Sequence, residues 1–306
     1  MNQTPTRIGS SKRVTASGVP REVIMVDRGM TSVFDRGPIP NFVSARLAVA
    51  RTTQAACVFT ALRHHNIDTH FLVREDDTRL RVKECRVRGL PLLSGATLAD
   101  MIGLEVLFRL RATEKFCNRV AAGEVPIEKI DLPDGVTLEP GVKFQTPFVE
   151  ASTKWRPGGD VYLSDSEAAD VAGVTPAELE RVFATTVRAS FVIDKMCAET
   201  NLTLDDGKFE FARHRGSGTF MIIDGVSLDE LGVRMGNQWF GKNLLRFFYK
   251  EQHKEWLADL EIAQRTYPDD ETKWPEYPPL PEDLIKLHVQ RYERVAKNWS
   301  RWVSRL

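Results

Sequence analysis

One stretch limits the possible folds of this chain more than any other: residues 206–211, with the sequence DGKFEF. Side chains on a β-strand point alternately to its two faces. On a strand, Asp206, Lys208 and Glu210 would therefore share one face, and the two phenylalanines would share the other. This pattern predicts a strand that packs one face on a hydrophobic core and presents alternating charges on the opposite face.

The same strand is predicted to form half of a β-hairpin. A strand from Thr203 to Ala212, a turn over Arg215 to Gly218 and a second strand from Thr219 would bring Asp224 close to Glu210. Two facing carboxylates repel each other unless a cation lies between them. Mg²⁺ fits such a pair when substrate phosphates supply the remaining oxygen ligands. The alternative is a solvated edge hairpin with a charged outer face.

Basic residues near this hairpin indicate an anionic ligand. Arg234, Lys242 and Arg246 follow it closely and suit anionic ligands. Arg109 lies at the end of an apolar strand predicted from Met101 to Leu110, so its charge must find a partner or a cleft. A structural salt bridge is the alternative for Arg109.

Composition excludes several classes of protein. The 306 residues are enough for one large domain or two lobes. The 42 basic and 42 acidic side chains balance, so we do not expect a nucleic-acid surface. The four cysteines form no CxxC pair, which argues against a zinc site and favours a reducing cytoplasm. No apolar run approaches the roughly 20 residues that cross a membrane, and the N-terminus lacks the apolar core of a signal peptide.

Hydrophobic periodicity predicts an α+β fold in two lobes, with a boundary near Gly103. A capping box at Thr175 to Glu178 begins a helix that ends near Glu199. The stretch 267–281, rich in proline and acids, is expected to be an extended surface connection. The other predicted strands are Val23 to Val26, Thr69 to Val73 and Leu80 to Val87, and the other predicted helices are Val43 to Asn66, Phe240 to Gln264 and Glu282 to Ser304.

Several motifs, in one order along most of the chain, resemble the SAICAR synthetase family. Leu202 to Phe211 is similar to the family's L-x-D-x-K-x-E-F strand, and Ile223 to Asp229 is similar to the D-E-x-x-(S/T)-P-D segment that follows it. Each match is weak alone, and the shared order is fairly specific. The remaining matches are Thr31 to Asp35, Ile39-Pro40, Asp100 to Arg109, Lys154 to Asp160 and Phe240 to Arg246.

The resemblance implies a kinase-like or ATP-grasp-like fold with an ATP cleft between two lobes of antiparallel sheet. Residues 1–103 would form a β-rich lobe that covers the nucleotide, and residues 104–306 an α/β lobe with the metal, substrate and ATP sites. It also implies the reaction: L-aspartate is joined to the carboxylate of an aminoimidazole ribotide (CAIR) while ATP becomes ADP and phosphate. The γ-phosphoryl group would turn the carboxylate into an acyl phosphate that an amine can attack.

The resemblance further implies roles for individual residues. Glu210 and Asp224 would hold Mg²⁺, and Asp206, Lys208 and Lys154 would be catalytic. More residues are expected to bind ATP and the substrates. ATP would contact Lys154 and Lys208, Met101 beside the adenine, and Gly9, Ser11, Lys12 and Val14 in a phosphate-covering loop. The substrates would contact Arg109 and Arg234 at the ribotide phosphate, with Lys115, Asp160, Lys242 and Arg246 around them.

Departures from the family pattern concentrate at the substrate rim. Ser10 stands where the phosphate loop has a lysine, Gly225 replaces an acid, and Gly241 replaces an aspartate. Residues 114–115, Glu-Lys, replace small residues beside the ribotide phosphate, where Lys115 could substitute for a serine. The open alternatives are a divergent ligase for another carboxylate and amine in specialised metabolism, a nucleotide-binding protein without turnover, and a small-molecule kinase. The expected partners are small molecules, with no nucleic acid or membrane, and a homo-oligomer is possible.

Overall fold

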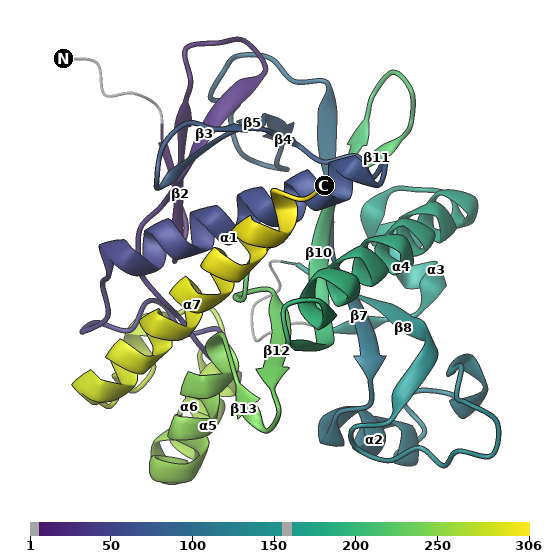
Figure 1. Ribbon diagram of the computed structural model, residues 1–306, viewed down its shortest axis with the longest axis vertical. Coiled ribbons are helices and arrows are strands. Elements are labelled where there is room, and N and C mark those ends of the chain that lie inside the picture. The colour runs from purple at the N-terminus through teal and green to yellow at the C-terminus, as the bar shows by residue number, and fades with distance from the viewer. Residues whose placement is uncertain (1–5, 155–160) are drawn as a thin grey trace.

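The computed structural model describes residues 6–154 and 161–306, and these residues form two curled sheets with helices around them (Figure 1). The first sheet is antiparallel and has five strands. In spatial order they are β1 (Thr6–Ile8), β2 (Lys12–Ala16), β3 (Glu22–Asp27), β5 (Arg79–Lys83) and β4 (Phe71–Arg74). All five strands of this sheet come from the first 83 residues of the chain.

The second sheet is larger and contains the predicted hairpin. Its central strands are β10 (Thr203–His214) and β7 (Ala99–Arg111), which pair antiparallel. The predicted return strand is β11 (Phe220–Ile223), paired with β10, so the hairpin is confirmed. The other strands are β12 (Leu231–Met235), β13 (Gln238–Trp239), β8 (Lys143–Thr153), β9 (Tyr162–Leu163) and β6 (Cys85–Arg86), the last of which runs parallel to β7.

Two long helices lie side by side across the molecule (Figure 1). The N-cap hydroxyl of Ser44 begins α1 (Ala45–His64), and α7 (Glu282–Val303) packs along it. The buried amide of Gln54 in α1 donates to the carbonyl oxygen of Tyr292 in α7 at 2.8 Å. This bond fixes α7 to α1.

The remaining helices cover the second sheet and its edges. The predicted capping box is present: Thr175 and Glu178 exchange hydrogen bonds at the start of α4 (Pro176–Ala198). Both α4 and α3 (Asp165–Ala172) pack on β7 and β8. The others are α2 (Glu114–Ala121), α5 (Lys242–Gln252) and α6 (Lys254–Thr266), with short 3₁₀ turns at Ile127–Lys129 and Glu271–Lys273.

Three sequence predictions need correction. The helix predicted over 240–264 is broken at His253, whose φ of −136° is not helical, and the change of direction packs Trp256 against Tyr249 at 5.0 Å. The strand predicted over 80–87 is two short strands in different sheets, β5 and β6. The connection 267–281 is largely extended but does not lie wholly on the surface, because Tyr277 is buried and its hydroxyl donates to the carbonyl of Val33.

The junction between the sheets lies at Glu84, between β5 and β6. Glu84 is buried, and its carboxylate accepts hydrogen bonds from the backbone amides of Leu93 and Ser94 at 2.7 Å. Position 103 lies inside β7, where Gly103 has a left-handed φ of 69°. The assignment of 1–103 and 104–306 to two lobes stays a prediction. None of the helices among the described residues is long and apolar enough to cross a membrane.

Candidate active site

The face of β10 that was predicted to present charges contacts basic and acidic side chains of the neighbouring strands. Lys208 donates to both carboxylate oxygens of Glu105 in β7 at 2.6 and 2.7 Å. Lys154, just beyond the end of β8, donates to Glu210. On the opposite face Phe209 is buried and stacks on Phe108 at 5.0 Å. The predicted alternation of charged and aromatic faces is confirmed.

Glu210 and Asp224 lie close enough for their charges to interact. Glu210 is opposite Ile223 in the β10–β11 pair, and Asp224 follows Ile223 directly with a left-handed φ of 65°. Burial and then the negative charge of Asp224 raise the pKa of Glu210 to about 7. Burial also opposes ionisation of Asp224, but the charges of Lys12 and Lys154 outweigh it and lower its pKa to about 2. The charge of Lys154 thus acts on both carboxylates.

These two carboxylates fit a Mg²⁺ ion bound together with phosphate. Each already contacts an ammonium group, Lys154 on Glu210 and Lys12 on Asp224, so a positive charge stabilises both. Within residues 6–154 and 161–306, no three or more His, Cys, Asp or Glu side chains lie close enough together to hold a metal ion by themselves. A Mg²⁺ ion here would therefore take most of its oxygen ligands from nucleotide phosphates and water, which is its usual mode of binding.

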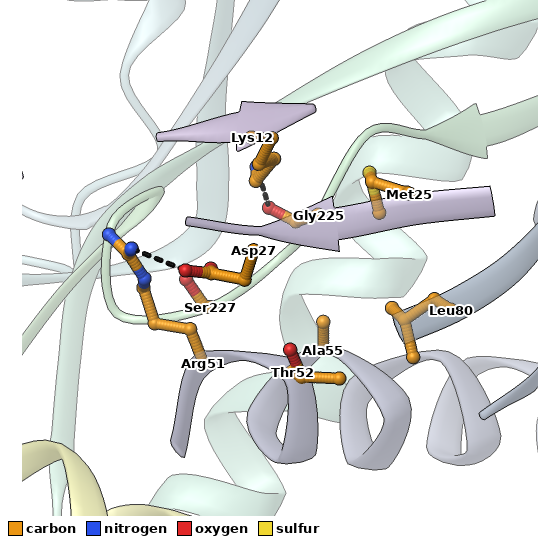
Figure 2. Close-up of a pocket in the computed structure, with 9 residues that line it drawn as sticks. All are labelled: Lys12, Met25, Asp27, Arg51, Thr52, Ala55, Leu80, Gly225 and Ser227. Carbon is orange, nitrogen blue, oxygen red and sulfur yellow. Dashed lines mark hydrogen bonds and ion pairs between the residues drawn. The ribbon is translucent and has the colours of Figure 1, made fainter. Parts of the chain in front are cut away.

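Lys12 connects the first sheet to the loop after β11. It belongs to β2, and its ammonium group donates to the carbonyl of Gly225 at 3.3 Å (Figure 2). It also reaches Asp224 at 3.1 Å and Glu230 at 3.3 Å. Burial disfavours its charge, but the surrounding carboxylates, above all Asp224 and Glu230, outweigh this and raise the pKa of Lys12. Within the loop before β2 the amide of Gly9 donates to the carbonyl of Lys12 at 2.8 Å.

The remaining loop residues lie around Lys12. The carbonyl of Ser11 accepts from the amide of Arg28 at 2.9 Å, which ties the loop to the end of β3. Val14 is half-buried in β2 and packs against the main core. Met101 in β7 packs against the small apolar cluster of Ala99, Ala212, Met221 and Ile223. The contact of Met101 with adenine stays a prediction.

Below Lys12 lies a small cavity between the first sheet, α1 and the loop after β11 (Figure 2). Arg51 of α1 is 2% exposed and donates to Asp27 at 2.6 Å and to Asp229 at 2.9 Å. Burial opposes ionisation of Asp229, but Arg51 and Lys242 lower its pKa. The hydroxyl of Tyr292 in α7 also donates to Asp229 at 2.6 Å. These buried bonds fix the loop that holds Asp224.

The arginines predicted to bind the ribotide phosphate have carboxylate partners. Arg109 is 7% exposed and donates to Glu150 at 2.6 Å, and Arg119 donates to both oxygens of the same carboxylate. This is the salt bridge that the sequence left open for Arg109. Arg234 donates to the buried carboxylate of Asp205 at 2.6 Å. Arg109 also lies 3.7 Å from Asp206, so it stays close to the charged face of β10.

The other predicted substrate residues are not all gathered at the hairpin. Lys242 points at buried Asp229 at 3.5 Å, and Arg246 donates to Asn243 at 3.1 Å. Lys115 is exposed on α2, beyond the end of β7. The six residue-to-residue steps from Glu105 to Arg111 span about 20 Å. Asp160 lies outside the described residues.

Several residues of the site were missed by sequence reasoning. Glu105, Glu230, Asp229, Asp27 and Arg51 had no assigned role. Glu105 and Asp229 did belong to motifs that resemble the family, which was a usable signal. Nothing in the local pattern marked Arg51, because its partner Asp229 is 178 residues away in the chain.

Fold and site together define a two-lobed α+β protein in which Lys12 and Lys154 contact a pair of carboxylates at a hairpin, Asp224 and Glu210. The sequence model of the SAICAR synthetase family matches residues 7–267, and the chain belongs to this family. A putative phosphoribosylaminoimidazole-succinocarboxamide synthase from Archaeoglobus fulgidus is 26% identical over 278 residues, covering 83% of this chain and 80% of that one. A synthase from Methanoregula boonei is 26% identical, covering 64% and 63%.

Solved structures show the same fold. The SAICAR synthase from Saccharomyces cerevisiae, complexed with SAICAR, superimposes with a TM-score of 0.69 at 16% identity, covering 97% of this chain and 95% of that one. A SAICAR synthetase in complex with ADP superimposes with a TM-score of 0.62 at 20% identity, covering 89% and 100%. These likenesses confirm the α+β fold predicted from the resemblance.

Proposed function

We propose that this protein is an ATP-dependent ligase that joins L-aspartate to the carboxylate of CAIR, the reaction implied by the family resemblance. Its relatives are named phosphoribosylaminoimidazole-succinocarboxamide synthases. The main support is a cluster of three lysines on carboxylates, in which Lys12 contacts Asp224, Lys154 contacts Glu210 and Lys208 contacts Glu105. Related structures hold ADP and SAICAR, a nucleotide and a ligation product of the proposed kinds.

The chemistry needs a positively charged site more than it needs covalent catalysis. Phosphoryl transfer to a carboxylate depends mainly on positioning and on cations that offset the developing charge. Glu210 and Asp224 would hold Mg²⁺, which when bound would neutralise phosphate oxygens. Lys12, in the lobe that would cover the nucleotide, and Lys154 would approach the phosphates from opposite sides.

The second half of the reaction forms the amide. The amine of L-aspartate attacks the acyl carbon, the bond from that carbon to the phosphate oxygen breaks, and phosphate leaves. The amine must lose a proton in this step. Burial raises the pKa of Asp206, which suits a proton acceptor, and we propose this role for it. The positive charge of Arg109 opposes this rise in the pKa of Asp206.

A direct assay tests the proposal. The protein is incubated with ATP, Mg²⁺, CAIR and L-aspartate, and ADP and the amide product are measured. We expect both products in equal amounts. Absence of nucleotide binding in calorimetry would refute every enzymatic role, and ADP without amide would refute the proposed pair of substrates.

A second candidate is a divergent ligase for a different carboxylate or amine. Asp205 favours it, because this buried carboxylate contacts Arg234 and lies 3.3 Å from Arg111, reducing the positive charge proposed for the ribotide phosphate. The same assay with a panel of carboxylates and amines separates the candidates.

The four cysteines are free thiols in the structure, which supports the proposed cytoplasmic location.

A further inference from the structure

Glu105 lies in the middle of β7 and contacts the lysines proposed to act on the nucleotide. Its carboxylate accepts from Lys208 at 2.6 and 2.7 Å, and Lys154 lies 3.8 Å from it. The whole residue is 8% exposed. The side chain of Lys208 is 37% exposed. Glu105 is therefore the buried partner of this ion pair, and Lys208 is the partner that borders the site.

The strand register explains why Glu105 has this place. Glu105 is directly opposite Glu210 on β10 and opposite Ser152 on β8. Two carboxylates opposite each other destabilise a sheet unless cations separate them. Lys154 provides such a cation, because it contacts Glu210 and lies within 4 Å of Glu105.

We propose that Glu105 is a positioning residue that orients Lys208 and Lys154 toward the phosphates of the nucleotide. The inference rests on the proposed ligase function. When a divalent cation occupies Glu210, repulsion weakens the contact between Lys154 and that carboxylate. Glu105 is a second carboxylate beside Lys154, and it holds Lys208 at the same time. It keeps the two ammonium groups in a fixed arrangement through the reaction.

A direct role of Glu105 in metal binding fits the contacts less well. Both of its oxygens face Lys208, and no third metal-binding side chain joins Glu210 and Asp224 among the residues that the structure describes. Glu105 therefore acts through lysines, and it is not proposed to touch the substrate.

The first experiment measures turnover. Glu105→Gln keeps the shape of the side chain but removes its charge, and we expect kcat to fall at least tenfold with a change in KM for ATP of less than about threefold. Glu105→Asp keeps the charge and is expected to recover part of kcat. Glu293→Gln removes an exposed partner of Arg46 and serves as the control, with normal turnover expected. Circular dichroism confirms that each variant is folded.

A double-mutant cycle tests whether Glu105 acts through Lys208. In a Lys208→Met background, Glu105→Gln should lower kcat by less than about threefold further, because its partner is already absent. Equal losses in both backgrounds would overturn the inference.

The second experiment needs neither nucleotide nor metal. Acetylation of individual lysines is followed by mass spectrometry in the free protein. We expect Glu105→Gln to speed labelling of Lys208 at least threefold and to leave Lys143 unchanged, since Lys143 pairs with Asp194 at 2.9 Å elsewhere. Unchanged labelling of Lys208 would overturn the inference.

The outcomes separate the two proposals. A wild-type protein that neither binds nor turns over nucleotide would refute the ligase function, and the role of Glu105 with it. An active wild type together with normal kcat in Glu105→Gln would refute only the role of Glu105.

Discussion

Gly207 is a position at which the packing of the core controls the site. It lies on β10 between Asp206 and Lys208, and one of its two Cα hydrogens points toward Phe108. A Cβ atom there would lie 2.5 Å from Cζ of Phe108 and 2.8 Å from Cδ2 of Leu231. Phe108 is fully buried and stacked on Phe209, so its ring cannot move aside easily. We therefore expect Gly207→Ala to displace the strand itself.

The expected cost follows from these distances. Carbon atoms prefer separations of about 3.5 to 4.0 Å, so strand or ring must move by about 1 Å. Overpacking of this kind costs about 1 to 3 kcal/mol, and alanine regains about 0.4 to 1 kcal/mol by restricting the unfolded chain. The middle of these two ranges gives a net loss of about 1.3 kcal/mol in the free energy of unfolding. With an m-value of about 3 kcal/mol per molar urea, the midpoint falls by about 0.4 M.

Turnover should fall as well, because Asp206 and Lys208 move with the strand. A misplacement of about 1 Å can cost up to about a hundredfold in rate. Urea unfolding followed by tryptophan fluorescence measures the first effect, and the ADP assay measures the second. Gly216→Ala is the control, since nothing lies within 4 Å of a Cβ there. A Gly207→Ala variant with wild-type midpoint and wild-type turnover would refute this account of the packing.

Three further predictions concern the metal ligands, the lobe contact and the buried core. Glu210→Gln should lower turnover about tenfold or more by removing a metal ligand, and near-normal turnover would contradict the assignment. In Gly225→Ala the added Cβ would lie 2.8 Å from Nζ of Lys12. Because this ammonium group ends a flexible side chain, it can move aside. The unfolding free energy should change by less than about 0.5 kcal/mol while KM for ATP rises severalfold, and an unchanged KM would argue against Lys12 as a nucleotide contact. Burial lowers the pKa of His288 to about 3, below its unfolded value near 6.5, so its contribution to stability is lost as pH falls from 6.5 toward 3. His288→Leu should therefore flatten the loss of stability between pH 6 and 4 by about 1 kcal/mol per pH unit in urea titrations, and an unchanged slope would show that His288 takes up no proton on unfolding.

Local sequence patterns were enough to predict most elements of the fold. The alternation in 206–211 predicted both the strand and its two faces, because strand periodicity depends only on neighbouring residues. The capping box at Thr175 predicted the start of α4 for the same reason. The break at His253 was not predictable, since residues on both sides of it have a helical pattern and the change of direction depends on packing of Trp256.

For the candidate site, too, the sequence predicted some features and not others. The acids and lysines of the hairpin were identified from the sequence, because the strand itself places them on one face. The sequence did not indicate that Arg109 and Arg234 pair with Glu150 and Asp205, because strand periodicity assigns a face but no ion-pair partner. Their proposed contact with a phosphate stays a prediction.

The sequence by itself determined that residues 203–224 form a hairpin with an aromatic face and a charged face. Only the tertiary structure decided which charge meets which. Lys208 and Glu105 are 103 residues apart, and Lys12 and Asp224 are 212 residues apart. The physical reason is that ion pairs form between side chains brought together by strand order and lobe packing, whereas periodicity in a sequence reports only on the few residues within reach of one turn or one strand.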